Sequence, residues 1–163
     1  MEKTRIGIYG QSIREEDESY LQELIDLLEH SEVPFSFYKP FYSKLQSRIR
    51  TTSNISFFSD HKELCNLVDV VISLGGDGTI LNVLTLVRDS GIPIAGVNMG
   101  RLGFLSSISK DNISKIVDEI LVKKAKIEEK ALIQLESSKE LFGEVNYAMN
   151  EFAIHKNDTS SMI

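Results

Sequence analysis

The chain has 163 residues, 42% of them hydrophobic, and a formal net charge of −6. This length suits one globular domain, or one domain with part of another, and it is long enough to bury a real core. The acidic balance argues against a duplex nucleic-acid partner, which needs a basic face. The apolar runs stay short of the roughly 20 residues of a membrane span, so we expect no membrane partner.

Two features predict the compartment. Cys65 is the one cysteine in the sequence, so no internal disulfide can form, which fits a reducing environment. The first residues, MEKTRIGIYG, enter a predicted strand almost at once, so we expect no signal peptide. A cytoplasmic location follows as the expectation.

The first three quarters of the chain alternate predicted strands and helices. Apolar, often β-branched runs predict strands over 5–10, 34–38, 55–58, 68–74 and 92–98. Helical periodicity predicts helices over 19–30, 80–87 and 111–122. Ser19 and Gln22 form a capping box at the start of the first, and the second is apolar nearly all round, so we expect it to be well buried. Residues 43–50 read as helix or loop. This alternation predicts an α/β fold with an open, mostly parallel sheet and flanking helices.

The pattern changes near residue 127. Residues 127–137 and 144–155 read as long strands joined by SSKELFG, which predicts an antiparallel hairpin that opens a β-rich, sandwich-like domain. We therefore expect an α/β nucleotide-binding domain at 1–122 and the opening strands of a truncated second domain at 123–163. A lone hairpin is marginal in water, so we expect the chain to be the front part of a longer protein.

The stretch LGGDGTILNV, residues 74–83, predicts a phosphate site. A buried strand, a glycine-rich turn and a helix start bring free N–H groups and the helix dipole together beyond the carboxyl end of a strand. Gly75, Gly76 and Gly78 let the backbone bend and a ligand come close. The stretch has no lysine of the G-x-x-x-x-G-K-[ST] kind, and it does not match G-x-G-x-x-G.

Asp77 needs its own explanation, because a carboxylate repels phosphate. One interpretation is a helix N-cap, for which aspartate is among the best residues. The other is a base or orienting group for a hydroxyl that attacks a phosphoryl group, with a metal contact as a further role. Both can hold together, since phosphoryl transfer depends mainly on positioning and charge neutralisation.

Several stretches resemble the NAD kinase family, also called ATP-NAD kinases. GGDGT is shared with diacylglycerol and sphingosine kinases and, more loosely, with 6-phosphofructokinases. GVNMGRLGFL at 96–105 resembles the NAD kinase segment after the next strand, NYAMNEFAIHK at 146–156 resembles the family's paired Asn-Glu motif, and the tail SSMI resembles its next strand. The order and the spacing of these segments along the chain also agree with those of the NAD kinase family. Lipid kinases usually continue GGDGT with an Asn-Glu-Val run, where this chain has ILNV.

The resemblance implies phosphoryl transfer from ATP, or in some members polyphosphate, to the 2′-hydroxyl of the adenosine ribose of NAD. It implies that Asp77 accepts the proton of that hydroxyl and that the GGDGT glycines contact the dinucleotide. It also implies that Asn150 and Glu151 hold ribose hydroxyls or nearby polar groups, and that Phe104 packs on adenine. The simpler alternatives are a core role for Phe104 and a half-exposed strand for Asn150 and Glu151.

The chain shows few cations to neutralise a triphosphate, so we expect ATP to come with Mg²⁺ or another divalent ion. The resemblance implies a homo-oligomer, dimer or tetramer, in the full-length protein. The family's later glycine-rich loop and the acidic residue before it do not occur in this sequence, so the chain carries the base and about half of the pocket. Two alternatives remain open. One is a lipid or sugar kinase with the same loop, and the other is a non-catalytic nucleotide-binding fragment.

Overall fold

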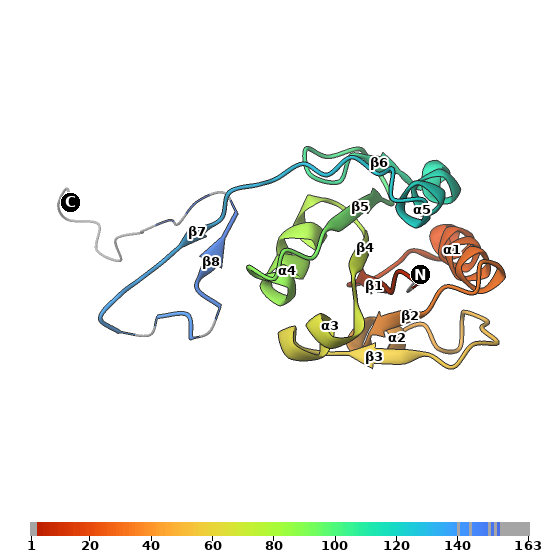
Figure 1. Ribbon diagram of the computed structural model, residues 1–163, viewed down its shortest axis with the longest axis horizontal. Helices are drawn as coiled ribbons and strands as arrows, with labels where there is room; N and C mark the ends of the chain where they lie inside the picture. Colours follow the sequence, from red (N-terminus) through yellow and green to blue (C-terminus); the bar gives the residue numbers. More distant parts are fainter. Residues whose placement is uncertain (1–2, 140, 144, 150, 152, 154–163) are drawn as a thin grey trace. The chain divides into compact units, whose positions relative to one another are not determined.

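The computed structural model describes residues 3–139, 141–143, 145–149, 151 and 153. The chain divides into two compact units, residues 1–127 and residues 128–163. The first is a parallel sheet with flanking helices and the second holds a small antiparallel sheet (Figure 1). The predicted fold class is confirmed. The domain boundary expected after residue 122 stays a prediction.

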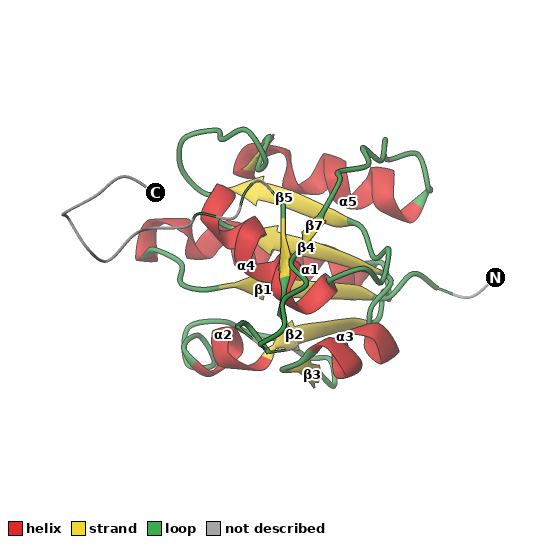
Figure 2. Ribbon diagram, turned by 90° about the vertical axis from the view of Figure 1, so that its left-hand side faces the viewer, coloured by secondary structure: helices red, strands yellow, loops and turns green. Residues whose placement is uncertain are grey.

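Six parallel strands form the larger sheet, in the order β3-β2-β1-β4-β5-β6. Figure 2 shows this order from β5 through β4, β1 and β2 to β3. Their bounds are β1 Ile6–Gly10, β2 Phe35–Tyr38, β3 Ser56–Phe58, β4 Val70–Leu74, β5 Ile94–Asn98 and β6 Ile108–Ser109. The order reverses between β1 and β4, and ligands of open parallel sheets bind outside the carboxyl ends of the strands at such a point.

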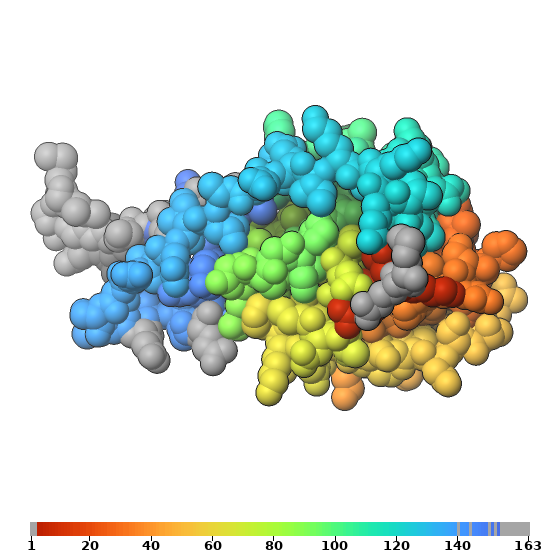
Figure 3. Space-filling model, viewed as in Figure 1, coloured from red at the N-terminus to blue at the C-terminus, as the bar shows by residue number. Residues whose placement is uncertain are grey.

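Helices cover both faces of this sheet. One face carries α1 (Glu18–His30) and α5 (Ile113–Leu121), and the other carries α3 (His61–Leu67) and α4 (Asp77–Val87). The short α2 (Lys39–Ser43) follows β2, while the 3-10 turns η1 (Glu15–Asp17) and η2 (Lys110–Asn112) lead into α1 and α5. Figure 3 shows α5 lying directly against α1. Within the residues that the structure describes, none of the helices is long and apolar enough to cross a membrane.

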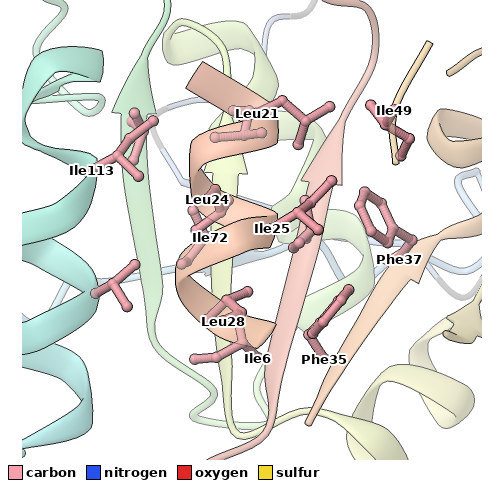
Figure 4. Packing of buried hydrophobic residues seen from close by; sticks show 14 of the residues in the cluster. Ile6, Leu21, Leu24, Ile25, Leu28, Phe35, Phe37, Ile49, Ile72 and Ile113 are labelled. Atoms are coloured by element: carbon pink, nitrogen blue, oxygen red, sulfur yellow. The ribbon is translucent and has the colours of Figure 1, made fainter. Parts of the chain in front are cut away.

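The larger core lies between the sheet and α1 (Figure 4). Side chains alternate across a strand, so Ile8 and Ile72 face α1 while Tyr9 and Val71 face α3 and α4. The predicted stripe of α1 is confirmed, with its four members fully buried: Leu21, Leu24, Ile25 and Leu28. Burying each such side chain contributes about 1.5–3 kcal/mol to the stability of the fold. This packing holds α1 against the sheet.

Some local predictions are wrong. The capping box is absent from α1, because Asp17 is its N-cap residue and the Gln22 amide instead donates to Asp26 (2.7 Å) and to the Arg50 carbonyl (2.8 Å). The second predicted helix begins at Asp77 rather than at residue 80, and Leu81 on its outer face is 38% exposed. Helices α2 and α3 and strand β6 were not predicted, since each is too short to show a period.

The second unit contains the antiparallel pair β7 (Ile133–Gln134) and β8 (Tyr147–Ala148). The predicted antiparallel pairing is confirmed, but within the described residues both strands are far shorter than the predicted 127–137 and 144–155. Residues 127–132 are almost all exposed and pair with no described strand. The sandwich-like character of this unit stays a prediction.

Candidate active site

The GGDGT stretch forms the loop between β4 and α4, as the sequence predicts. Gly75 has a φ of +152°, which side chains rarely adopt. A Cβ at Gly75 would overlap the side chain of Thr79. Its N–H donates to the Val97 carbonyl of β5 at 2.9 Å, so Gly75 ties the loop to the neighbouring strand.

The other two glycines leave room in front of the helix. Gly76 is the N-cap of α4, and Asp77 and Gly78 form its first turn. The N–H groups of a first turn have no acceptor within the helix. Apart from the chain neighbours of each glycine and the backbone of α4, no described atom lies within 4 Å of the place where a Cβ would stand on Gly76 or Gly78. The space beside both glycines is therefore open to a ligand, and the helix start next to it, with the positive end of the dipole, suits an anionic group.

Asp77 connects this loop to the one that follows β5. The N-cap interpretation is wrong, because Gly76 occupies that position and the Asp77 side chain does not cap α4. The carboxylate instead accepts four hydrogen bonds, from the amides of Phe104 (2.9 Å), Leu105 (3.0 Å) and Ser106 (2.9 Å) and from the hydroxyl of Ser106 (3.0 Å). One side chain therefore joins residues almost thirty positions apart in the sequence.

These contacts keep the Asp77 carboxylate ionised. The Ser106 amide contributes most, followed by the other donors, and against the opposing effect of burial they lower the pKa of Asp77 to about 2. The charge also lies in the first turn of α4, where the helix dipole favours it. A carboxylate with so low a pKa is a weak base but a good hydrogen-bond acceptor.

The loop after β5 is held at both ends by Asn98, which is 3% exposed. Its Oδ1 accepts from the Gly100 amide at 2.7 Å, and its Nδ2 donates to the Ser106 hydroxyl at 2.8 Å. Gly103 is required in this loop, because a Cβ there would overlap the Asp77 carboxylate. The loop presents Phe104 with its side chain 100% exposed, so the core alternative for Phe104 is wrong.

The loop after β1 is linked to the same edge of the sheet. Arg14 donates to the Met99 carbonyl at 2.8 Å and, through Nε, to Asp17 at 2.8 Å. Asp17 is fully buried and also accepts from Lys110 at 2.5 Å. Burial raises the pKa of Asp17, but hydrogen bonds from Lys110 and Arg14 outweigh it and lower the pKa below its usual value. The sequence did not predict this cluster of Arg14, Asp17 and Lys110. Its one available signal was the spacing of three residues between Arg14 and Asp17, which suits an ion pair.

Comparison with known proteins bears directly on this geometry. The family described as the ATP-NAD kinase N-terminal domain matches residues 6–125, which include β1 to α5 and every residue of the Asp77 contacts. The chain belongs to this family. The resemblance drawn from GGDGT and its neighbouring segments is thereby confirmed.

Individual relatives carry the name NAD kinase. The protein from Cytophaga hutchinsonii is 38% identical over 158 residues, which are 96% of this chain and 54% of that protein. The one from Flavobacterium psychrophilum is 34% identical over 161 residues, 98% of this chain and 55% of that protein. The chain thus spans about half the length of the curated relatives it matches. A crystal structure of yeast NADH kinase complexed with NADH shares the fold, with a TM-score of 0.73 at 21% identity over 91% of this chain and 47% of that one.

Two predicted site residues of the ATP-NAD kinase resemblance lie in the second unit. Asn150 is outside the described residues, as are positions 160–163 of the tail. Glu151 is exposed and lies beyond the end of β8, so it is not part of a described strand. The roles of both residues stay predictions.

A resident metal centre is not formed by the described residues. Among them, no group of three or more His, Cys, Asp or Glu side chains is arranged to hold an ion. A shallow groove of about 590 Å³ runs along α1, where Glu18, Gln22, Arg48 and Arg50 help to line it. Its lining mixes acidic and basic side chains and includes no residue of the loops after β1, β4 and β5. We therefore place the site at the GGDGT loop.

Proposed function

We propose that the chain is the α/β part, with the first strands of a second domain, of an NAD kinase. The whole enzyme would transfer a phosphoryl group from ATP to the 2′-hydroxyl of the adenosine ribose of NAD and form NADP. One observation carries the proposal: a carboxylate fixed by four hydrogen bonds stands in the first turn of α4, between two glycines with open space beside them. Membership of the ATP-NAD kinase family supports it.

The chemistry assigns each part of the loop a task. The donors of Gly76 to Gly78 and the dipole of α4 bind phosphate of the nucleotide. The ribose hydroxyl donates to Asp77 and attacks the γ-phosphorus, so a new P–O bond forms while the bond to the ADP oxygen breaks. The hydroxyl proton passes to Asp77 and then to solvent, and ADP leaves. Because the loop contacts lower the pKa of Asp77 to about 2, Asp77 is a weak base for this proton and acts chiefly by orienting the hydroxyl.

Further residues complete the proposed binding site. Phe104 offers a fully exposed aromatic face for adenine. Asn150 and Glu151 would hold ribose hydroxyls, since amide and carboxylate groups suit a diol. Arg101 is exposed and has no ion-pair partner within the described part of the chain, so its guanidinium is available to a phosphate.

The remaining attributes follow from the same proposal. ATP enters as its Mg²⁺ complex, because magnesium is usually held by phosphates with one or two carboxylates, and Asp77 is the carboxylate at hand. We place the enzyme in the cytoplasm and propose that the full-length protein forms a dimer or tetramer. Its partners are NAD and ATP.

The test is an assay of NADP formation by the full-length protein with ATP, Mg²⁺ and NAD. We expect Asp77→Asn to lower the rate about 100-fold or more, since a positioned acid–base group contributes about 10²–10⁴-fold. The asparagine NH₂ group would also face the loop amides, so melting of the variant is measured alongside. A rate that stays within a few-fold of the original protein contradicts the assigned role.

The same preparation separates the alternatives. A lipid or sugar kinase would transfer labelled phosphate from ATP to diacylglycerol or a sugar and would leave NAD unchanged. A non-catalytic fragment would bind nucleotide and form no NADP. Labelled NADP as the sole product is the outcome that our proposal predicts.

A further inference from the structure

The two oxygens of the Asp77 carboxylate have different surroundings. Oδ1 accepts three hydrogen bonds, from the Leu105 amide, the Ser106 amide and the Ser106 hydroxyl. Oδ2 accepts one, from the Phe104 amide. A carboxylate has about four acceptor positions, roughly two on each oxygen. Oδ1 is therefore fully occupied by the protein, whereas Oδ2 has capacity for one more donor.

Ser106 contributes most to this asymmetry. It is fully buried, and both its amide and its hydroxyl donate to Oδ1. Its hydroxyl oxygen also accepts from Nδ2 of Asn98 at 2.8 Å. Because the proton of this hydroxyl is directed to Asp77 and a lone pair to Asn98, the hydroxyl has one favourable orientation.

Asn98 is itself fixed in orientation. Its Oδ1 accepts from the Gly100 amide at 2.7 Å, which leaves its NH₂ group facing Ser106. The hydrogen bonds therefore run in one direction, from Asn98 to Ser106 to Asp77. Asn98 and Ser106 are both buried, at 3% and 0% exposure, so water competes little for these contacts.

We infer that Ser106, oriented by Asn98, is a positioning residue that fastens Oδ1 of Asp77 to the loop and turns Oδ2 toward the ribose hydroxyl. The inference rests on the proposed function of Asp77 and deepens it. Because Ser106 and Asn98 are both buried, their role in this inference is to position Asp77 rather than to bind substrate. The terminal torsion of an aspartate is broad. Loss of the Ser106 hydroxyl, one of the three donors to Oδ1, therefore lets the carboxylate shift away from this orientation even though the loop amides remain.

The test compares Ser106→Ala with Glu29→Gln in the full-length protein. Glu29 is a matched control, because it also tethers a loop, through Thr51 Oγ1 (2.6 Å) and the Ser53 amide (2.9 Å), and also has a pKa lowered to about 2 by such contacts, the Thr51 hydroxyl first. That loop precedes β3, at the amino edge of the sheet, whereas Asp77 follows β4 at the carboxyl edge.

For Ser106→Ala we expect kcat to fall about 10-fold or more, since a small misplacement of a reacting or orienting group is enough for a loss of this size. KM for NAD and ATP should change less than about 3-fold, because the ligand contacts remain. The acid limb of the kcat profile and the Asp77 carboxyl titration, followed by ¹³C NMR, should both move to higher pH. Glu29→Gln should lower only the melting temperature.

Equal losses of kcat in both variants would overturn the inference, because a general loss of stability explains them. A rise confined to KM would overturn it too, because it would place Ser106 in substrate binding rather than in the positioning of Asp77. If Ser106→Ala does not fold, Ser106→Cys keeps the volume while donating only weakly, and it should show the same fall in kcat and the same shift in pH. An unchanged kcat in Ser106→Cys would contradict the positioning role of Ser106. Asp77→Asn separates the proposed function from the inference about Ser106. If Asp77→Asn stays active, the proposed function is wrong. If Asp77→Asn is inactive while the Ser106 variants keep their kcat, only the role of Ser106 is wrong.

Discussion

At the scale of single residues, Asp77 has two tasks that compete for one carboxylate. Three contacts on Oδ1 and one on Oδ2 hold the loop after β5. The proposed reaction needs an acceptor for a ribose hydroxyl. The asymmetry between the two oxygens reconciles these demands, because the structural contacts concentrate on one oxygen and leave an acceptor position on the other.

Two acids with low pKa values predict how stability depends on pH. Glu29 and Asp77 both titrate near 2 in the folded protein, below the roughly 4 of unfolded carboxyls. A lowered folded pKa means that their stabilisation is complete above about pH 4 and is lost as the pH falls toward 2. Urea unfolding should therefore give a lower free energy of unfolding at pH 2.5 than at pH 5.

The variant Glu29→Gln isolates one of these groups. It should unfold at lower urea concentration at pH 7, and its free energy of unfolding should decrease less between pH 5 and pH 2.5 than that of the original protein. The Asp77 contribution remains, so the decrease should not vanish. Identical decreases in the two proteins would show that the loop contacts of Glu29 add no stability.

At the scale of elements, the turns η1 and η2 are joined through Asp17. This buried carboxylate accepts from Arg14 and Lys110 and links the loop after β1 to the segment before α5. Asp17→Ala removes a fully buried carboxylate that accepts from both Arg14 and Lys110, while Arg14 keeps its ion pair with Glu16. We expect the free energy of unfolding to fall by about 2 kcal/mol or more, since hydrogen bonds to charged groups are lost. Urea unfolding at pH 7 measures the change.

Asp118 provides the control for that prediction. It lies on the exposed face of α5, and surface substitutions away from such contacts usually change stability by less than about 0.5 kcal/mol. Asp118→Ala should therefore unfold close to the original protein. If Asp17→Ala and Asp118→Ala behave alike, the ion cluster does not hold the two turns together.

Elements of different length were predictable to different degrees. Helices α1 and α5 and strands β1, β4 and β5 follow from periodicity and β-branched runs, and GGDGT marks the loop between β4 and α4. Helices α2 and α3 are too short to show a period. The contact of Asp77 with Ser106 was not predictable either, because it depends on how two loops meet at the edge of the sheet. Local rules instead favoured a helix cap.

At the scale of the whole molecule, the strand order explains why the site residues meet. The loops after β1, β4 and β5 leave the carboxyl edge beside the point where the order reverses between β1 and β4, which is where such sheets bind ligands. The first unit carries Asp77 and Phe104, and the second carries Glu151. The chain covers 54% of the Cytophaga hutchinsonii relative, so the proposed activity belongs to the full-length protein.

A crystal structure of the full-length protein with NAD bound tests the central claim most directly. The account predicts Oδ2 of Asp77 about 2.6–3.2 Å from the 2′-hydroxyl of the adenosine ribose, while Oδ1 keeps its contacts with Leu105 and Ser106. A complex in which that hydroxyl lies beyond reach of Oδ2, or in which Oδ1 has left the loop to meet it, would contradict the account.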